Sequence, residues 1–195
     1  MIKYLMLGLV GCPATLKVDP PSASDSSVTE DPLPTEFGVI EREDCDQKAI
    51  GSDVCNIVLY DQNKEIWELY DHKGKVVVLD ISTVWCGPCQ AAGMHTQGIQ
   101  DDYGTQIEFV TFLVEGPTGE APTDEDMQIW VDTHNITTAP ILQASREYVM
   151  DPAGITGYLV GGFPTYVFLN KDMQIHVGAV GFNETYVRSV IDELL

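Results

Sequence analysis

The feature that most constrains this chain is a strand pattern that leads directly into two closely spaced cysteines. Residues 75–82 read KVVVLDIS, a mostly β-branched and aliphatic run without the alternation of a half-exposed strand. Such a run predicts a strand that is covered on both faces. Cys86 and Cys89 follow at once, and a helix is predicted over residues 88–103. The cysteines should therefore lie where a buried strand gives way to a helix.

Strand and helix patterns alternate along the rest of the chain. Further strand candidates occupy residues 54–60, 106–114, 164–169 and 174–180, with a return strand or loop at 65–70. Thr123 and Asp126 have the spacing of an N-cap pair before a second helix, and Asn183 is suited to cap a final one. The pattern predicts an α/β domain in which helices cover both faces of a central mixed sheet.

The two cysteines have three interpretations. A structural zinc site needs four ligands, usually two close pairs, but the chain has one CxxC, and its four histidines lack ligand spacing. A structural disulfide that closes so small a loop restrains little of the unfolded chain. A redox pair fits better, because the helix N-terminus would stabilise the Cys86 thiolate and Cys89 would lie one turn away to resolve a mixed disulfide. This chemistry needs neither a metal nor another cofactor.

The sequence around the cysteines resembles the thioredoxin superfamily. The segment VVLDISTVWCGPC, residues 77–89, is similar to its active-site segment, and GGFPTYVFL, residues 161–169, resembles the loop that carries its cis-proline. Residues 59–80 resemble the N-terminal hairpin and following strand of the membrane-tethered TlpA/ResA-like (redoxin) branch. The resemblance covers roughly residues 50–195. It implies a thioredoxin-like fold with an N-terminal hairpin and a central insertion between Val114 and Gly161.

The resemblance also implies roles for individual residues. Asp80 would be a buried acid that accepts the proton of Cys89 through water, although a strand-end Asp bonded to backbone remains an alternative. Pro164 would be the cis-proline, rather than a trans-proline that opens a strand. The partner-binding residues implied are Trp85, Gly87, Pro88, Phe163 and Thr165. Met94 departs from the family, since it stands at the position of a helix-kinking proline, and Gly93 is the other candidate for a bend.

The first residues resemble an export signal. MIKYLMLGLVGC combines Lys3 with a short apolar run, and residues 9–12 resemble a bacterial lipobox in which Cys12 carries lipid. The run is too short to span a bilayer. Residues 13–36 are rich in proline and serine and lack aromatic residues, which predicts a disordered linker. We therefore expect a signal over residues 1–12, a linker over 13–36 and a folded domain over 37–195.

An exported location suggests a role for two further cysteines. In an oxidising compartment, Cys45 and Cys55 would form a structural disulfide that ties the start of the domain to its first strand. Two unpaired thiols are the alternative, since the sequence does not give the geometry of the pair.

The chain carries 30 acidic and 10 basic residues, a net charge of −20. Such a surface repels phosphate backbones, so nucleic acid is not an expected partner. The expected function is that of a lipid-anchored thiol–disulfide oxidoreductase of the cell envelope, in the periplasm or on the outer face of the cytoplasmic membrane. It would act on protein thiols or disulfides as a reductant, and a membrane-embedded or thioredoxin-type donor would recharge it. A disulfide-introducing oxidant, a thiol peroxidase and a non-catalytic binding module or metallochaperone are the alternatives.

Overall fold

The computed structural model describes residues 38–39, 49–150, 158 and 160–195. All of them belong to the second of two compact units of the chain, Pro32–Leu195. The predicted signal, the predicted linker and Cys45 lie outside the described residues. The division into a signal, a linker and a folded domain therefore stays a prediction.

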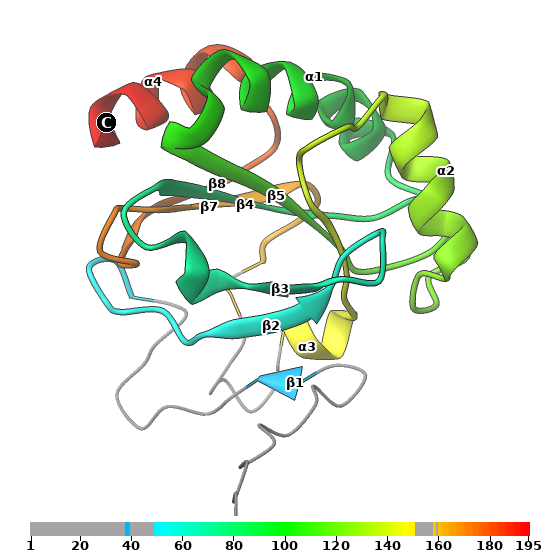
Figure 1. Ribbon diagram of the computed structural model, residues 1–195. Coiled ribbons are helices and arrows are strands. Elements are labelled where there is room, and N and C mark those ends of the chain that lie inside the picture. Colours follow the sequence, from blue (N-terminus) through cyan, green and yellow to red (C-terminus); the bar gives the residue numbers. More distant parts are fainter. Residues whose placement is uncertain (1–37, 40–48, 151–157, 159) are drawn as a thin grey trace, which may run out of the picture. The chain divides into compact units, whose positions relative to one another are not determined.

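A five-stranded mixed sheet lies at the centre of this unit (Figure 1), in the order β6-β5-β4-β7-β8. Its strands are β4 (Val76–Ser82), β5 (Ile107–Leu113), β6 (Ile141–Gln143), β7 (Thr165–Leu169) and β8 (Ile175–Val180). β4 pairs in parallel with β5 and antiparallel with β7. Every residue of β4, β5 and β7 is buried, which explains why their sequences are mostly apolar and lack the alternation of a half-exposed strand.

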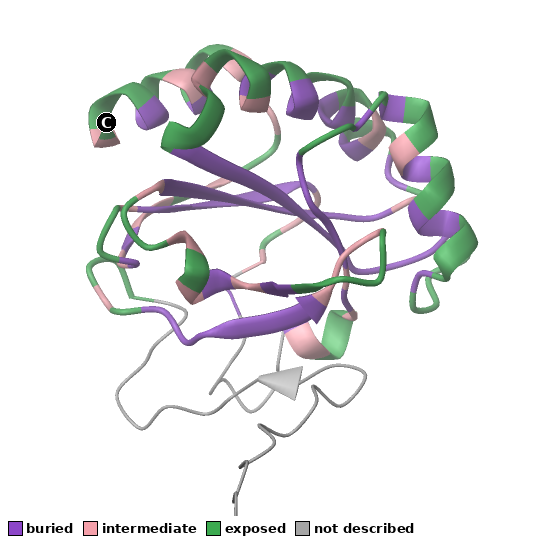
Figure 2. Ribbon diagram, in the orientation of Figure 1, coloured by how far each residue is buried: buried purple, intermediate pink, exposed green. Residues whose placement is uncertain are grey.

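Two helices cover one face of the central sheet. α1 (Gly87–Tyr103) and α4 (Glu184–Leu194) lie together on this side in Figure 1, and Figure 2 shows buried residues along both. Ile99 of α1 and Ile191 of α4 join Phe109 in one apolar cluster. The Asn183 side chain accepts a hydrogen bond from the Tyr186 amide, which confirms the predicted cap of the last helix.

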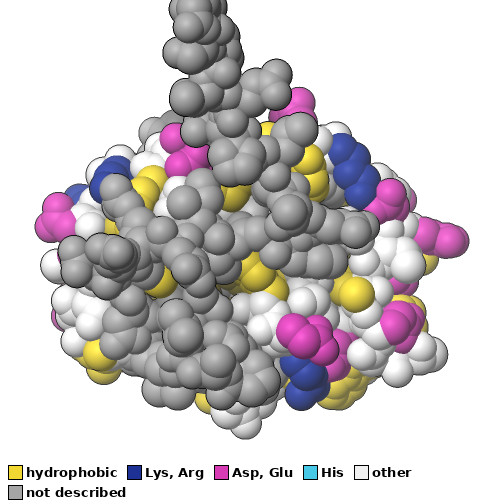
Figure 3. Space-filling view, turned by 90° about the horizontal axis from the view of Figure 1, so that it is seen from below, with side chains coloured by type: hydrophobic (Ala, Val, Ile, Leu, Met, Phe, Trp, Pro, Cys, Tyr) yellow, Lys and Arg dark blue, Asp and Glu magenta, His cyan; other side chains and the backbone are white. Residues whose placement is uncertain are grey.

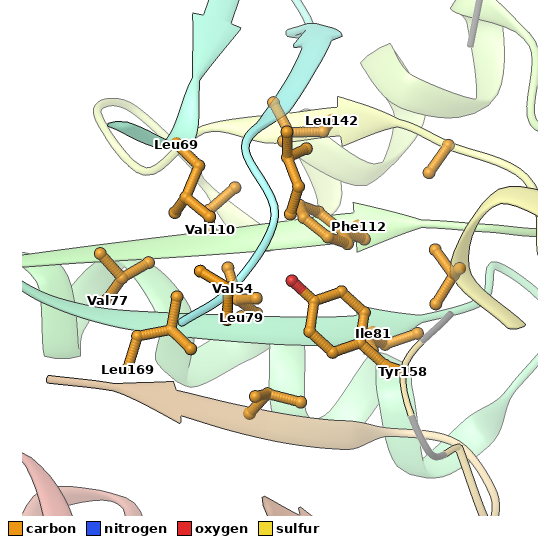
Figure 4. Close-up of a cluster of buried hydrophobic side chains, with 14 of the residues drawn as sticks. Val54, Leu69, Val77, Leu79, Ile81, Val110, Phe112, Leu142, Tyr158 and Leu169 are labelled. Carbon is orange, nitrogen blue, oxygen red and sulfur yellow. The ribbon is translucent and has the colours of Figure 1, made fainter. Parts of the chain in front are cut away.

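The opposite face is covered mainly by a second, smaller sheet. It consists of β1 (Gly38–Val39), β2 (Ile57–Tyr60) and β3 (Ile66–Glu68), followed by a 3₁₀ turn, η1 (Leu69–His72). Leu69, Val54 and Tyr158 pack against Leu79 and Phe112 of the central sheet (Figure 4). The predicted N-terminal hairpin is therefore present, and it occupies most of the face for which the alternating pattern predicted helices.

The described part of the central insertion contains one long helix and one short helix. α2 (Asp124–His134) begins at a capping box between Thr123 and Asp126, as their spacing predicted, and packs against α1 and β6. α3 (Arg146–Met150) follows β6. A second 3₁₀ turn, η2 (Gly104–Gln106), joins α1 to β5.

Gly93 marks a close approach between two helices. α1 runs unbroken through Gly93 and the exposed Met94. A Cβ atom at Gly93 would lie 2.8–3.0 Å from ring atoms of His134. His134 is 4% exposed, and burial lowers the pKa of its imidazole. Gly93 therefore gives the buried ring room against α1, a role that the sequence did not indicate.

Alanine substitutions at the two glycines of α1 should have opposite effects on stability. Gly93→Ala forces the His134 ring to move and should lower the free energy of unfolding by about 1–3 kcal/mol. Gly98→Ala, whose Cβ meets nothing within 4 Å, should raise it by up to about 1 kcal/mol because alanine favours the helix. Urea unfolding of the two variants checks this, and equal effects would contradict the proposed role of Gly93.

Candidate active site

The two cysteines lie at the start of α1, directly beyond the end of β4. Cys86 is the N-cap residue of the helix, and its Sγ accepts a hydrogen bond from the Cys89 amide at 3.2 Å. Cys86 and Cys89 form a disulfide, with Cα atoms 5.2 Å apart. The predicted position of Cys86 at a helix N-terminus is thus confirmed. The amide that points at Sγ would also stabilise a thiolate there.

The two sulfurs differ in how near they lie to the surface. Cys89 is fully buried and Cys86 is 4% exposed, whereas Trp85 is 51% exposed and Gly87 and Pro88 are exposed as well. The residues that flank Cys86 in sequence thus form the surface over it. Cys86 is thus slightly the more accessible of the two cysteines, and the predicted roles of attacking and resolving cysteine stay predictions.

The loop before β7 forms the other side of the site. The Phe163–Pro164 peptide bond is cis, which is the geometry that the resemblance implied. The Phe163 carbonyl oxygen lies 3.5 Å from Cys86 Sγ, and the Phe163 ring meets the Trp85 ring edge to face at 6.2 Å. Thr165 is buried, and its hydroxyl donates to the Gly162 carbonyl at 2.6 Å. Its side chain holds the loop, and its predicted contact with a partner stays a prediction.

Asp80 is a fully buried carboxyl group in the middle of β4. Its two oxygens accept hydrogen bonds from the hydroxyls of Ser82, at 2.7 Å, and Thr111, at 3.5 Å. Burial raises the pKa of Asp80 to about 7, although both hydrogen bonds act in the opposite direction. The predicted burial of this acid is confirmed, and its pKa lies where a proton can be taken up or released near neutral pH.

The sequence missed a carboxylate that contacts Trp85. Glu115 follows β5, is 6% exposed and accepts a hydrogen bond from the Trp85 indole at 2.7 Å. It also forms an ion pair with Arg146 of α3. The hydrogen bond from Arg146 lowers the pKa of Glu115 against the opposing effect of burial, so this group is a carboxylate at neutral pH.

The partners of Asp80 were missed as well, for two different reasons. Ser82 lies two residues after Asp80 on the same face of β4, so strand alternation alone could have found it. Thr111 stands opposite Asp80 only through the register of β4 with β5. Glu115 and Arg146 likewise meet the site through tertiary contacts, and no sequence motif indicates either.

The described residues contain no group of three or more His, Cys, Asp or Glu side chains able to hold a metal ion. Three of the histidines instead contact carboxylates, in the pairs His72–Glu108, His95–Glu184 and His176–Glu193. Within the same ranges, no helix is both long and apolar enough to cross a membrane.

The chain is similar in sequence to a small number of known proteins. No family model matches the chain. The thioredoxin-like protein YneN of Bacillus subtilis is 28% identical over 116 residues, which are 57% of this chain and 62% of that relative. The chain thus spans less than two thirds of that relative's length. An uncharacterised protein of Haemophilus influenzae is 22% identical over 134 residues, or 66% of this chain and 82% of its own.

Several solved structures share the fold of this chain. A DsbF homologue of Corynebacterium diphtheriae has a TM-score of 0.62 at 20% identity, and the match covers 84% of this chain and 96% of that one. The exposed lipoprotein thioredoxin Etrx1 of Streptococcus pneumoniae has a TM-score of 0.60 at 24% identity, over 72% of this chain and 100% of that one. The thioredoxin domain of a thiol–disulfide oxidoreductase from Bacteroides vulgatus also reaches 0.60, at 16% identity over 75% and 99% of the two chains. The fold is therefore thioredoxin-like, as the resemblance implied.

The buried acid should make stability depend on pH. Protonated Asp80 contributes stability below its unfolded pKa of about 3.9, and this is lost as the pH rises through the folded value of about 7. Asp80→Asn cannot ionise, so it should be more stable than the parent chain at pH 8 by up to about 4 kcal/mol. The difference should be much smaller at pH 4. Urea unfolding of the oxidised proteins at both pH values tests this, and a pH-independent difference would contradict it.

Proposed function

We propose that this chain, with its thioredoxin-like fold, is a thiol–disulfide oxidoreductase that exchanges disulfides with partner proteins through Cys86 and Cys89. The observation that carries the proposal is the disulfide between these residues at the start of α1, with the Phe163 carbonyl 3.5 Å from Cys86 Sγ. The fold alone does not fix the activity. The site adds a disulfide at a helix N-terminus, exposed residues beside it and a buried acid in the preceding strand.

The first step would be attack by Cys86 on a partner disulfide. In the reduced protein, the Cys86 thiolate attacks one partner sulfur, a mixed disulfide forms and the other partner sulfur leaves as a thiolate. The partner would lie in an extended conformation against the loop before Pro164, where the Phe163 backbone can pair with it. Trp85, Gly87 and Pro88 would provide the rest of the contact surface, because all three are exposed around Cys86.

The second step would be resolution by Cys89. Its thiolate attacks Cys86 Sγ, the partner leaves with its second thiolate and the Cys86–Cys89 disulfide forms. Cys89 must first lose its proton, which Asp80 would accept through water. A carboxyl group with a pKa of about 7 is suited to this transfer, since it is partly ionised at neutral pH.

Each turnover reduces one partner disulfide with two electrons and leaves the protein oxidised. A separate donor, membrane-embedded or thioredoxin-type, would return two electrons and restore the dithiol. We favour the reducing direction because Gly87 and Pro88 form the thioredoxin-type dipeptide, and the residues between the cysteines influence the reduction potential. Maturation of c-type cytochromes is one process that uses such a reductant.

We further propose that the protein works in the cell envelope and is anchored through lipid on Cys12. The lipobox-like residues 9–12 support this, and one solved structure with the same fold is described as an exposed lipoprotein. Acidic side chains lie scattered over the face shown in Figure 3 rather than in one patch, which suits a solvated surface. Cys55 is buried, and its predicted bond to Cys45, which lies outside the described residues, would suit an oxidising compartment.

Single cysteine substitutions should separate the two chemical steps. Cys86→Ser should abolish reduction of insulin in the presence of dithiothreitol, because the attacking thiolate is gone. Cys89→Ser should also lose turnover, but it should accumulate a mixed disulfide with a disulfide-containing peptide, detectable by mass spectrometry. Ala91→Ser, an exposed change in the same helix, serves as the control and should keep the parent rate. Turnover by Cys86→Ser would contradict the proposed mechanism.

The reduction potential of the Cys86–Cys89 pair should decide the direction of electron flow. We expect a value near the thioredoxin value of about −270 mV, measured by equilibration in glutathione or dithiothreitol buffers. A value near about −120 mV, as in DsbA, would instead indicate a disulfide-introducing oxidant. Cys89→Ala provides the baseline, because it removes the two-electron transition of this pair.

A further inference from the structure

An ion pair, Glu115 with Arg146, contacts both members of the aromatic pair beside Cys86, which are Trp85 and Phe163. Glu115 accepts the Trp85 indole hydrogen bond at 2.7 Å, and its backbone carbonyl accepts the Val84 amide at 2.9 Å. One side-chain and one backbone hydrogen bond thus hold Glu115 to the segment that precedes Cys86. Because Glu115 is 6% exposed, solvent screens its charge only weakly.

The positive charge lies on the side of the cis-proline loop. The Arg146 guanidinium carbon lies 5.5 Å from the centre of the Phe163 ring, within cation–π range, while its Nε bonds Glu115. Phe163 in turn places its carbonyl oxygen 3.5 Å from Cys86 Sγ. Glu115 therefore reaches the site through Trp85, which precedes Cys86 in the chain, and Arg146 reaches it through Phe163.

We infer that Glu115 and Arg146 form a balanced charge pair that sets how strongly the site favours the Cys86 thiolate, while it also fixes Trp85 and Phe163 as the two walls around this sulfur. Both are positioning residues, since neither touches the reacting atoms. The inference deepens the proposed function and rests on it for its biological meaning. Its physical content, the ionisation of Cys86, can be measured without any turnover.

The reasoning follows from Coulomb's law. A negative charge near Cys86 disfavours the thiolate and a positive charge favours it, and the two effects largely cancel while both residues are present. Removing one partner exposes the effect of the other. The two single substitutions should therefore shift the ionisation of Cys86 in opposite directions. A general loosening of the site would not have opposite effects in the two variants.

The other charged groups near this ion pair should not change the opposing effects of Glu115 and Arg146 on Cys86. Glu147 is exposed beside Arg146 and acts on it through solvent. Asp80 is fully buried, its carboxyl group is hydrogen-bonded to Ser82 and Thr111, and it is present in every variant below. Trp85 can keep its hydrogen bond when Glu115 becomes Gln, because the amide oxygen still accepts it.

The test is the pH dependence of Cys86 alkylation by iodoacetamide in the reduced full-length chain, with the Cys86 adduct scored by mass spectrometry. Glu115→Gln should shift the midpoint to lower pH, and Arg146→Gln should shift it to higher pH. At a pH below both midpoints we expect roughly a threefold or larger change in alkylation rate for each, in opposite senses. The double variant should return towards the parent rate, and Arg146→Lys, which keeps the charge, should stay near it.

Arg188→Gln is the matched control. Arg188 forms ion pairs with Glu184 and Asp102 between α4 and α1, so this change removes one positive charge away from the site. It should leave the Cys86 midpoint at the parent value. The inference is overturned if the two single variants shift the midpoint in the same direction, or by no more than the control does. If the parent chain does not reduce insulin, the proposed function is wrong. Opposite shifts of the alkylation midpoint in the two single variants would still support the charge pair.

Discussion

The in-register pairing of β4 with β5 and β7 is the constraint on which the rest of the structure depends. Ser82 stands opposite Leu113, and Ile81 stands opposite Thr165, so three chain segments reach one edge of the sheet together. The cysteines follow β4, Glu115 follows β5, and Phe163 and Pro164 precede β7. Parallel strands place their C-terminal ends at the same edge, which is where α/β sheets commonly assemble a site.

The burial of Asp80 within β4 is energetically unfavourable. A carboxyl group at the centre of a buried strand loses hydration, and two hydroxyl hydrogen bonds compensate only in part, so its pKa rises to about 7. An asparagine there would avoid the ionisation penalty but could not take up a proton. Retaining the acid makes physical sense if the site needs a proton acceptor next to a buried thiol, which is the role proposed for it.

Much of the fold could be predicted, because apolar runs and capping residues act locally. The strands at 76–82 and 107–113 and the caps at Thr123 and Asn183 were predicted to within about a residue. Two features could not be predicted from pattern alone. Helices were expected on both faces, but the hairpin covers most of one, since a buried strand reads the same whether a helix or a sheet lies over it. Gly93 suggested a bend in α1, but it makes room for His134, a contact between residues far apart in the chain.

The sequence by itself determined the chemistry of this protein: a cysteine pair at the start of a helix, an acid in the preceding strand and a proline before a later strand. The cysteine pair was readable because it depends on neighbours in the chain, such as the dipeptide between Cys86 and Cys89, whereas the acid and the proline were identified through the resemblance to the thioredoxin superfamily. Tertiary structure alone decided the electrostatic surroundings, namely Thr111 on Asp80 and the Glu115–Arg146 pair beside Trp85 and Phe163. The physical reason is that charges act through space, and strand register and helix packing, not sequence spacing, set the distances between them.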